Sequence, residues 1–319
     1  IVNIGMLGSV SDGKSTTVNR LSGVTTQRHS NELKRNITIK PGYANMKIYK
    51  DDNGYNTKSG ELVHHLSFID CPGHYQLILT MMSCIKLMDG IILVVSAAES
   101  ITMKPQLIQH IMAIKMSGIK NVIVLLNKLD LVKKDVAKQR YVELVKTLDK
   151  YDIKPKKIIP VCMNLNIGVD NVLESIMEYM GPREREDKTP LFMISRSFDI
   201  NYVNTNINEL KGGVIGGSVI QGKFKVGDII EIRPGINKKS HITEIVSIKS
   251  DTTDLDIAYP GGLIGIGTNI DPYYCKNDNM IGMVVGLKDM LPPIYNIINM
   301  TYHNIDFGND FTSNKVLVI

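Results

Sequence analysis

The segment Gly8-Ser-Val-Ser-Asp-Gly-Lys14-Ser15 restricts the possible fold more than any other feature of the sequence. It follows an apolar stretch, Ile1 to Leu7, with the pattern of a buried strand, and it opens a helix-like stretch, Ser15 to Leu21. Between a strand and a helix, glycines let backbone N–H groups approach phosphate oxygens, and the positive end of the helix faces the same charge. We therefore expect Lys14 to bind the β and γ phosphates of a nucleotide and the Ser15 hydroxyl to ligate Mg²⁺.

A second motif, Asp70-Cys-Pro-Gly73, follows the apolar stretch Leu66 to Ile69. A carboxylate at the carboxyl end of a strand can hold Mg²⁺ directly or through water. The Gly73 N–H can donate to a γ phosphate, so this turn would sense whether that phosphate is present. Alone, Asp-x-x-Gly is typical of simple turns, but its position after a strand favours the functional interpretation.

The third motif, Asn127-Lys128-Leu-Asp130, follows the apolar stretch Asn121 to Leu126. The Asp130 carboxylate can accept hydrogen bonds from N1–H and the exocyclic amine of guanine, a donor pair that adenine lacks. The Lys128 stem can lie along the base. The alternative is a solvated helix start capped by Asp130, but three motifs in this order, each after a strand, predict a guanine nucleotide site.

Two further residues are candidates with an open alternative each. Thr38 could complete the Mg²⁺ shell when the γ phosphate is present, or it is an ordinary β-branched strand residue. His74 could orient the attacking water, because phosphoryl transfer depends on positioning more than on a strong base. A lone histidine is more often structural, so only its place after the Asp70–Gly73 turn supports this role.

The first 180 residues alternate short apolar runs with helical patterns, and their nearly continuous Ile, Val and Leu content is typical of strands covered on both faces. This alternation predicts an α/β nucleotide-binding domain over residues 1–182 with a mostly parallel, doubly wound sheet. The strand-like runs are Ile1 to Leu7, Leu66 to Ile69, Gly90 to Val95, Asn121 to Leu126 and Lys157 to Val161. The helical patterns are Ser15 to Leu21, Leu77 to Leu87, Pro105 to Met116, Asp135 to Asp149 and Asp170 to Met180.

The pattern changes after Gly181-Pro182, where a charged run, Arg183 to Lys188, forms a linker. Beyond it, short alternating stretches such as Asp228 to Ile232 and Met283 to Leu287 are separated by glycine turns. This pattern is typical of an all-β barrel, which we expect over residues 189–297. Residues 298–319 are too few for a domain, and we interpret them as the beginning of a truncated second β-barrel.

Charge and cysteine content restrict the function only weakly. The net charge of +5 fits an RNA partner as well as an ordinary surface. No apolar run reaches the roughly 18 residues that a membrane-spanning helix needs. The chain contains no Cys-x-x-Cys pair, and three of its four cysteines lie in apolar segments, which favours free thiols in a reducing cytoplasm. The cysteines are Cys71, Cys84, Cys162 and Cys275.

Together the motifs resemble those of the translational GTPases related to elongation factor Tu. The stretch Asn31 to Lys40, followed by Gly42-Tyr-Ala-Asn-x-Lys-Ile-Tyr49, is similar more narrowly to the gamma subunit of archaeal and eukaryotic translation initiation factor 2. The resemblance covers nearly the whole chain and implies a GTPase domain followed by two β-barrels. Further similar stretches are Arg196 to Asp199, Leu210 to Gly213, Gly216 to Ser218, Arg233 to Gly235 and Pro260 to Thr268.

The resemblance implies a cytoplasmic GTPase that, bound to GTP, carries initiator methionyl-tRNA to the small ribosomal subunit. Its partners would be the alpha and beta subunits of the same factor, a GTPase activator and a nucleotide exchange factor. His74 would act on the attacking water, and Ser15, Thr38 and Asp70 would hold Mg²⁺. The implied GTP-binding residues are Ser11, Asp12, Gly13, Lys14, Ser15, Thr16, Gly73, Asn127, Lys128, Asp130, Cys162 and Met163.

In the resembled family the aminoacylated end of the tRNA lies between the GTPase domain and the first barrel, where Tyr43, Gly265 and Thr268 are candidate contacts. Tyr43 would stack on the terminal adenosine, or it packs on its own sheet. Two alternatives to this function stay open. One is another elongation factor Tu-like carrier of aminoacyl-tRNA, such as the selenocysteine factor, and the other is a GTP-binding scaffold subunit with little hydrolysis.

Three departures from the family pattern concern the predicted nucleotide and metal sites. The phosphate loop usually contains His-Val-(Asp or Ala)-His, whereas here it is Ser9-Val-Ser-Asp12, and the Asp12 charge should lower phosphate affinity unless it points to solvent or Mg²⁺. Cys162-Met163 replaces Ser-Ala, although a backbone N–H can still reach guanine O6. The cysteine knuckle of many relatives is missing between Lys50 and Glu61, so we expect no zinc.

Overall fold

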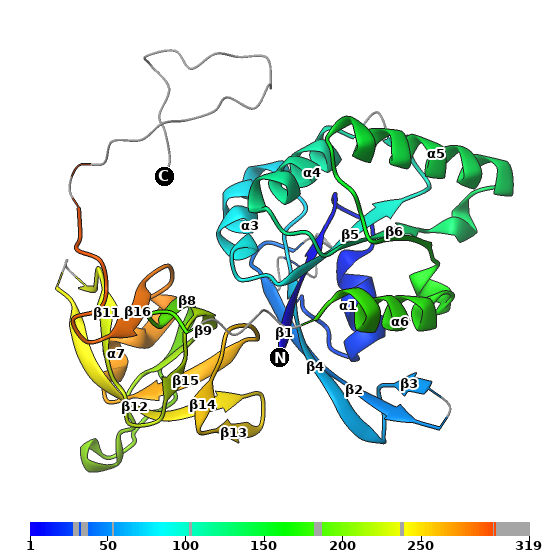
Figure 1. Cartoon of the computed structure of the whole chain (residues 1–319). Helices are drawn as coiled ribbons and strands as arrows, with labels where there is room; N and C mark the ends of the chain where they lie inside the picture. The colour runs from blue at the N-terminus through cyan, green and yellow to red at the C-terminus, as the bar shows by residue number, and fades with distance from the viewer. Residues whose placement is uncertain are drawn as a thin grey trace.

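The computed structural model describes residues 1–27, 32, 38–52, 54–101, 104–181, 187–236, 239–295 and 297. Figure 1 shows two bodies, a sheet flanked by helices that contains the N-terminus and a smaller body built of strands. The predicted start of a second barrel, residues 298–319, lies outside the described residues. Within the described ranges no helix is both long and apolar enough to cross a membrane.

The sheet of the first body has the strand order β3-β2-β4-β1-β5-β6-β7. Strands β4, β1, β5, β6 and β7 pair in parallel, which confirms the predicted mostly parallel sheet. The hairpin β2–β3 extends it as an antiparallel edge that the sequence patterns did not predict. The strands are β1 (Val2–Leu7), β2 (Gly42–Asp51), β3 (Gly54–Asn56), β4 (Glu61–Asp70), β5 (Gly90–Ser96), β6 (Val122–Asn127) and β7 (Lys157–Pro160).

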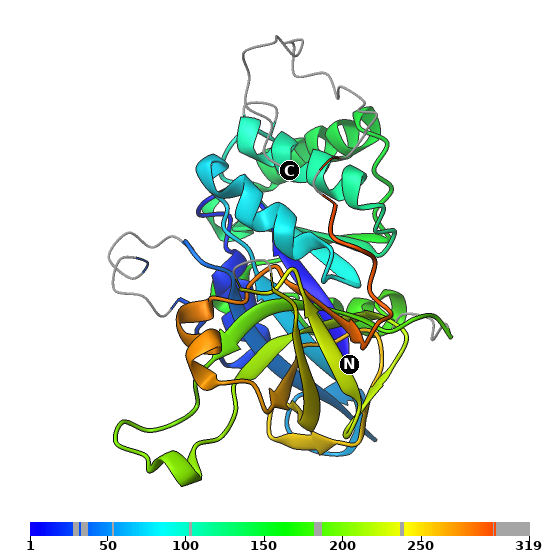
Figure 2. The ribbon, with the colours of Figure 1, turned by 90° about the vertical axis from the view of Figure 1, so that its left-hand side faces the viewer.

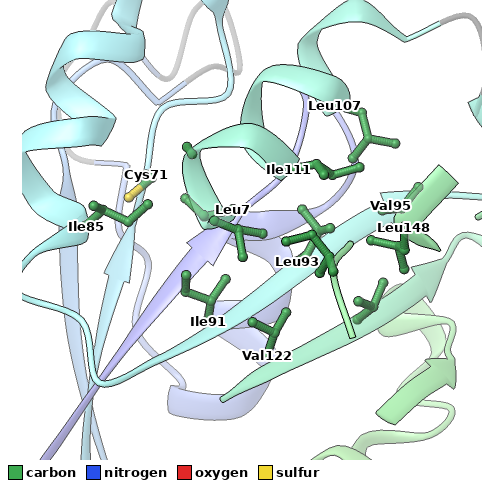
Figure 3. Close-up of a cluster of buried hydrophobic side chains, with 14 of the residues drawn as sticks. Leu7, Cys71, Ile85, Ile91, Leu93, Val95, Leu107, Ile111, Val122 and Leu148 are labelled. Carbon is green, nitrogen blue, oxygen red and sulfur yellow. The ribbon is translucent and has the colours of Figure 1, made fainter. Parts of the chain in front are cut away.

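Helices cover both faces of this sheet because its central strands carry apolar side chains on both faces. In β5, Ile91, Leu93 and Val95 face one hydrophobic cluster, whereas Ile92 and Val94 face the other. The first cluster packs against α3, α4 and α5, and the second against α1 and α6. Figure 3 shows the first cluster, with side chains of β1 and β5 beneath those of α4. The helices are α1 (Lys14–Ser22), α3 (Ile78–Ile85), α4 (Pro105–Ser117), α5 (Lys134–Lys150) and α6 (Val169–Tyr179).

The second body is an antiparallel barrel, as the alternating pattern predicts. Its strands follow the order β11-β16-β8-β9-β15-β12-β13, and a further pairing of β11 with β12 closes it. The described residues also include a short helix, α7 (Pro272–Cys275), at one side of the barrel in Figure 2. The strands are β8 (Leu191–Phe198), β9 (Val214–Gln221), β10 (Phe224–Lys225), β11 (Ile229–Arg233), β12 (His241–Ser250), β13 (Thr253–Leu255), β14 (Ile257–Ala258), β15 (Ile264–Thr268) and β16 (Val284–Leu287).

The two bodies contact each other through the start of β1 and the apolar surface beside it. The fully buried Asn3 side chain donates to the Leu87 carbonyl at 2.8 Å and to the Ser218 hydroxyl of the barrel at 3.1 Å. Three barrel side chains, Met193, Ile220 and Leu263, pack against the cluster beneath α3 and α4. The barrel is therefore held against the sheet by both polar and apolar contacts.

Candidate functional site

The three motifs converge at one edge of the sheet because parallel strands end on the same side. The loop after β1, the turn after β4 and the turn after β6 surround a cavity of about 390 Å³. A polar crevice at the carboxyl ends of parallel strands is the usual ligand site of such sheets. The cavity is lined by Val10, Ser11, Gly13, Lys14, Ser15, Thr16, Gln27, Thr38, Gly73, Asn127, Lys128 and Asn164.

The loop from Gly8 to Gly13 is tightly closed on itself. Gly8 and Gly13 have φ values of 140° and 103°, and a Cβ at Gly8 would lie 2.2 Å from the Val94 carbonyl oxygen. The Lys14 Nζ donates to the Ser9 carbonyl across the loop at 2.7 Å. Burial lowers the pKa of Lys14, and the Asp70 and Asp12 charges oppose that shift. The lysine is thus held inside the loop, where a bound anion would favour its charged form.

Asp70, at the end of β4, accepts hydrogen bonds from hydroxyl groups of the site. Its Oδ2 accepts hydrogen bonds from Ser15 and Thr26, each at 2.6 Å, and the Thr38 hydroxyl lies 3.2 Å from that of Ser15. Asp70 Oδ1 is buried and has no hydrogen-bond partner among the described residues. Burial raises the pKa of Asp70, although these hydroxyls and Lys14 oppose the shift. A carboxylate with an unused oxygen among hydroxyls is a donor set suited to Mg²⁺.

The turn after Asp70 brings Gly73 directly onto the phosphate loop. A Cβ at Gly73 would lie 2.5 Å from Lys14 Nζ and 2.8 Å from the Val10 nitrogen, so only glycine fits there without displacement. His74 follows, but it is outside the described lining of the cavity, and its Nδ1 accepts a hydrogen bond from the Gln76 N–H at 3.3 Å. The imidazole is therefore adjacent to the site rather than inside it.

Asn127 joins the base-binding and phosphate-binding motifs. Its buried side chain donates to the Asp12 carbonyl at 3.0 Å and accepts from the Met163 N–H at 3.1 Å. The Met163 N–H is thus occupied, so among the described residues it is not the backbone donor that we expected this turn to offer to guanine O6. Asn164 is the residue of that turn that lines the cavity. The buried Cys162 thiol donates to Oδ1 of the exposed Asp130 at 2.9 Å, which places these two predicted residues side by side.

The Asp12 carboxylate points neither to solvent nor into the cavity. Asp12 is 1% exposed, and its Oδ1 lies 2.8 Å from Lys104 Nζ. Its Oδ2 accepts the Ser9 N–H at 3.1 Å. We expected the Asp12 charge to lower phosphate affinity unless the carboxylate pointed to solvent or to Mg²⁺. It points to neither, and its charge is offset instead by the buried ion pair with Lys104.

A second and larger cavity, of about 480 Å³, lies between the sheet and the barrel. Tyr43 and Gly265 line it, whereas Thr268 does not and instead donates its hydroxyl to the Gly213 carbonyl at 2.7 Å. Thr268 is 3% exposed, so its side chain is not available to a ligand. Burial raises the pKa of Tyr43, while a hydrogen bond with Ser195 of the barrel opposes this shift.

Several residues in or beside the two cavities belong to no motif that sequence reasoning could have used. Thr26 donates to Asp70 and also lines the larger cavity, and Lys104 pairs with Asp12 from 92 residues away in the chain. Gln27 and Asn164 line the smaller cavity. Only contacts between distant parts of the chain identify them.

Comparison with known families agrees with both bodies. The model of the elongation factor Tu GTP binding domain matches residues 1–182, and the model of elongation factor Tu domain 2 matches residues 212–286. The translation initiation factor 2 subunit gamma of Methanocaldococcus jannaschii is 43% identical over 96% of this chain and 79% of its own length. The eukaryotic translation initiation factor 2 subunit gamma of Encephalitozoon cuniculi is 40% identical over 94% of this chain and 75% of its own length.

Solved structures of translation factors have a similar fold. A bacterial selenocysteine-specific elongation factor, EF-Sec, superposes with a TM-score of 0.75 at 25% identity over 90% of this chain. Elongation factor SelB from Methanococcus maripaludis, in complex with the GTP analogue GPPNHP, gives 0.69 at 22% identity, also over 90% of this chain. The chain spans 45% and 55% of the lengths of these two structures.

His110, on α4 behind Gly73, makes the stability of the site dependent on pH. Its Nε2 lies 3.5 Å from the Gly73 carbonyl oxygen, and burial together with the Lys14 charge lowers the pKa of His110 from 6.5 to about 3. Between these values the unfolded chain binds more protons than the folded one, so the free energy of unfolding falls as pH falls. We expect a loss of about 2 kcal/mol at pH 5 relative to pH 7 from this group alone.

The measurement is urea denaturation of the wild type and of His110→Gln at pH 7 and pH 5. The variant should lack the His110 part of the pH dependence. Equal pH dependence in the two proteins would show that His110 is not held neutral.

Proposed function

We propose that this chain, which belongs to the gamma subunits of translation initiation factor 2, delivers initiator methionyl-tRNA to the small ribosomal subunit in a GTP-dependent cycle. The family membership makes it a GTP-binding translational GTPase. The observation that carries the rest of the proposal is the pair of cavities, one at the phosphate loop and one between the sheet and the barrel, joined through Thr26.

In the proposed nucleotide site the phosphates lie on the loop from Ser11 to Thr16. Lys14 binds the β and γ phosphates, and the Gly73 N–H senses the γ phosphate. Ser15, Thr38 and Asp70 hold Mg²⁺, which supplies charge neutralisation on the phosphate oxygens. The unpartnered buried Asp70 Oδ1 supports this assignment, because a bound cation would satisfy this oxygen.

At the other end of the site, Asp130 accepts hydrogen bonds from the guanine edge and the Lys128 stem lies along the base. Asn127 connects the base-binding and phosphate-binding motifs through its hydrogen bonds. The backbone of Cys162 and Met163 belongs to the base-binding turn. His74 positions the attacking water after it turns toward the cavity. Because the imidazole is outside the described cavity lining, an activator that turns it inward would accelerate a slow intrinsic reaction.

In the proposed tRNA site the aminoacylated end occupies the cavity between the sheet and the barrel. Tyr43 offers an aromatic ring for the terminal base, and the glycine backbone at Gly265 allows close approach. Lys40, Arg196 and Lys249 also line this cavity, and their cationic groups suit a phosphate backbone. The alpha and beta subunits, a GTPase activator and an exchange factor complete the proposed set of cytoplasmic partners.

A short chain of contacts connects the nucleotide site to the proposed tRNA cavity, so the bound nucleotide can affect tRNA binding. Thr26 donates to Asp70 in the nucleotide site, and its Cβ packs against Gly42, at the start of β2, where a Cβ would come within 2.6 Å. Gly42 is followed by Tyr43, and both line the larger cavity. A change in the ligands of Asp70 therefore acts directly on the wall of that cavity.

The central test compares binding of initiator and elongator aminoacyl-tRNAs, with GTP and with GDP, by filter binding on the full complex with its partner subunits. We expect initiator methionyl-tRNA to bind at least about 10-fold more tightly in the GTP state, since coupling energies between sites are typically 1–3 kcal/mol. Preference for an elongator would favour the alternative carrier function. Absence of hydrolysis in a single-turnover assay with ribosomes and activator would favour the scaffold alternative.

Asp130→Asn tests the reading of guanine. The carboxamide replaces an acceptor by a donor, which fits the 2-carbonyl of xanthine, so GTP affinity should fall about 100-fold while xanthosine triphosphate affinity rises. Asp135→Asn, at the exposed start of α5, is the matched control. Unchanged GTP affinity, measured by competition with labelled GDP, would remove Asp130 from the site.

Thr26→Val tests the route between the cavities. It removes the hydroxyl that donates to Asp70 and keeps a similar shape, so the ratio of initiator tRNA affinities with GTP and GDP should fall about 5-fold or more. The neighbouring exposed Thr25→Val is the control. If both variants keep the wild-type ratio in filter binding, the coupling does not pass through Thr26.

A further inference from the structure

A buried lysine contacts the phosphate loop from outside the described lining of the nucleotide cavity. Lys104 immediately precedes α4, and Pro105 occupies the first turn of that helix. Its ammonium lies 2.8 Å from Asp12 Oδ1 and 3.2 Å from Glu99 Oε2. Lys104 is 8% exposed and Asp12 is 1% exposed, whereas Glu99 is 71% exposed, so the contact with Asp12 is the buried one.

The position of this lysine is not explained by the helix that it precedes. A cation at a helix N-terminus is opposed by the helix dipole, which favours anions there. The residue before a proline is restricted to extended conformations, and Lys104 has φ −106° and ψ 89°, so its backbone direction is fixed. Its ammonium is therefore stabilised by the carboxylates it contacts, chiefly by the buried Asp12.

Asp12 needs such a partner because it lies within the loop that faces the phosphates. Its Oδ2 accepts a hydrogen bond from the Ser9 N–H, and Lys14 Nζ donates one to the Ser9 carbonyl. Both charged side chains therefore bind the backbone of the same residue. Without Lys104, the Asp12 carboxylate would be a buried charge without a cationic partner on that side, and it would repel an incoming phosphate.

We propose that Lys104 is a positioning residue for nucleotide binding, whose ammonium neutralises Asp12 so that the altered phosphate loop keeps a closed shape and a net positive field toward GDP or GTP. The proposal rests on the guanine nucleotide site of the proposed function. It adds a charged contact from the residue that precedes α4, outside the three sequence motifs. Lys104 acts through Asp12 and does not itself touch the phosphates.

The test is a double-mutant cycle of GDP affinity, measured by calorimetric titration at one ionic strength. Lys104→Met keeps most of the side-chain stem but removes the charge, and should lower GDP affinity on the order of 10-fold. Lys104→Arg should stay within about threefold of the wild type, because a guanidinium can replace the ammonium. Lys115→Met, at an exposed position on the same helix, is the matched control.

The deciding variant is Asp12→Asn combined with Lys104→Met, in which both charges are removed and the acceptor for the Ser9 N–H remains. Its GDP affinity should recover to within about threefold of the wild type, since the repulsion is gone. A purely structural role for Lys104 predicts no recovery, and that result would overturn the proposal.

If Lys104→Met alone does not fold, the comparison moves to the Asp12→Asn background, where adding Lys104→Met should change GDP affinity by less than about threefold. A 10-fold loss there would give Lys104 a role independent of Asp12 and would overturn the proposal. Wild-type protein that fails to bind GDP would contradict the proposed function itself. Wild-type binding with equal affinities across the cycle would contradict only the role of Lys104.

Discussion

The parallel pairing of β1 between β4 and β5 is the constraint on which the nucleotide site depends. In this register Met6 lies beside Asp70 and Leu7 beside Leu93, so the phosphate loop begins next to the carboxylate that ends β4. The strand is completely buried, and a shift by one residue would move its apolar side chains to the wrong face. The hydrophobic core therefore fixes the distances between loops whose own sequences are polar and short.

Burial disfavours the charged forms of Lys14 and Asp70, and a bound ligand of opposite charge would offset this cost. Burial lowers the pKa of Lys14 and raises the pKa of Asp70, so each group is less inclined to carry its charge than it would be in water. A phosphate beside Lys14 and a cation beside Asp70 would each favour the charged form of its neighbour. Binding of a nucleotide with a metal thus exchanges two unfavourable burials for two charge pairs, which favours binding the two ligands as one unit.

The parallel strands, the longer helices and the barrel were predictable because they depend on local apolar patterns, whereas the hairpin β2–β3 was not predicted. The motifs were predictable because each combines a strand end with a few fixed residue types. The contacts that complete the site were not. Lys104 lies 92 residues from Asp12, Thr26 lies 44 residues from Asp70, and neither has a local pattern that sets it apart from a surface residue. Thr268, chosen from a glycine turn that resembles a family segment, packs inward because its hydroxyl caps the turn at Gly213.

Asn127 shows why the unusual residues of the loop can be accommodated. Its amide holds the Asp12 carbonyl on one side and the Met163 N–H on the other, so the loop backbone is fixed from the base-binding end, independently of the Asp12 side chain. A Cβ at Gly13 would lie 2.3 Å from the Asn127 side-chain nitrogen, so the loop packs directly against the residue that ends β6. With the backbone fixed by Asn127, a substitution at position 12 changes charge more than shape, and a single cation behind the loop is sufficient to offset it.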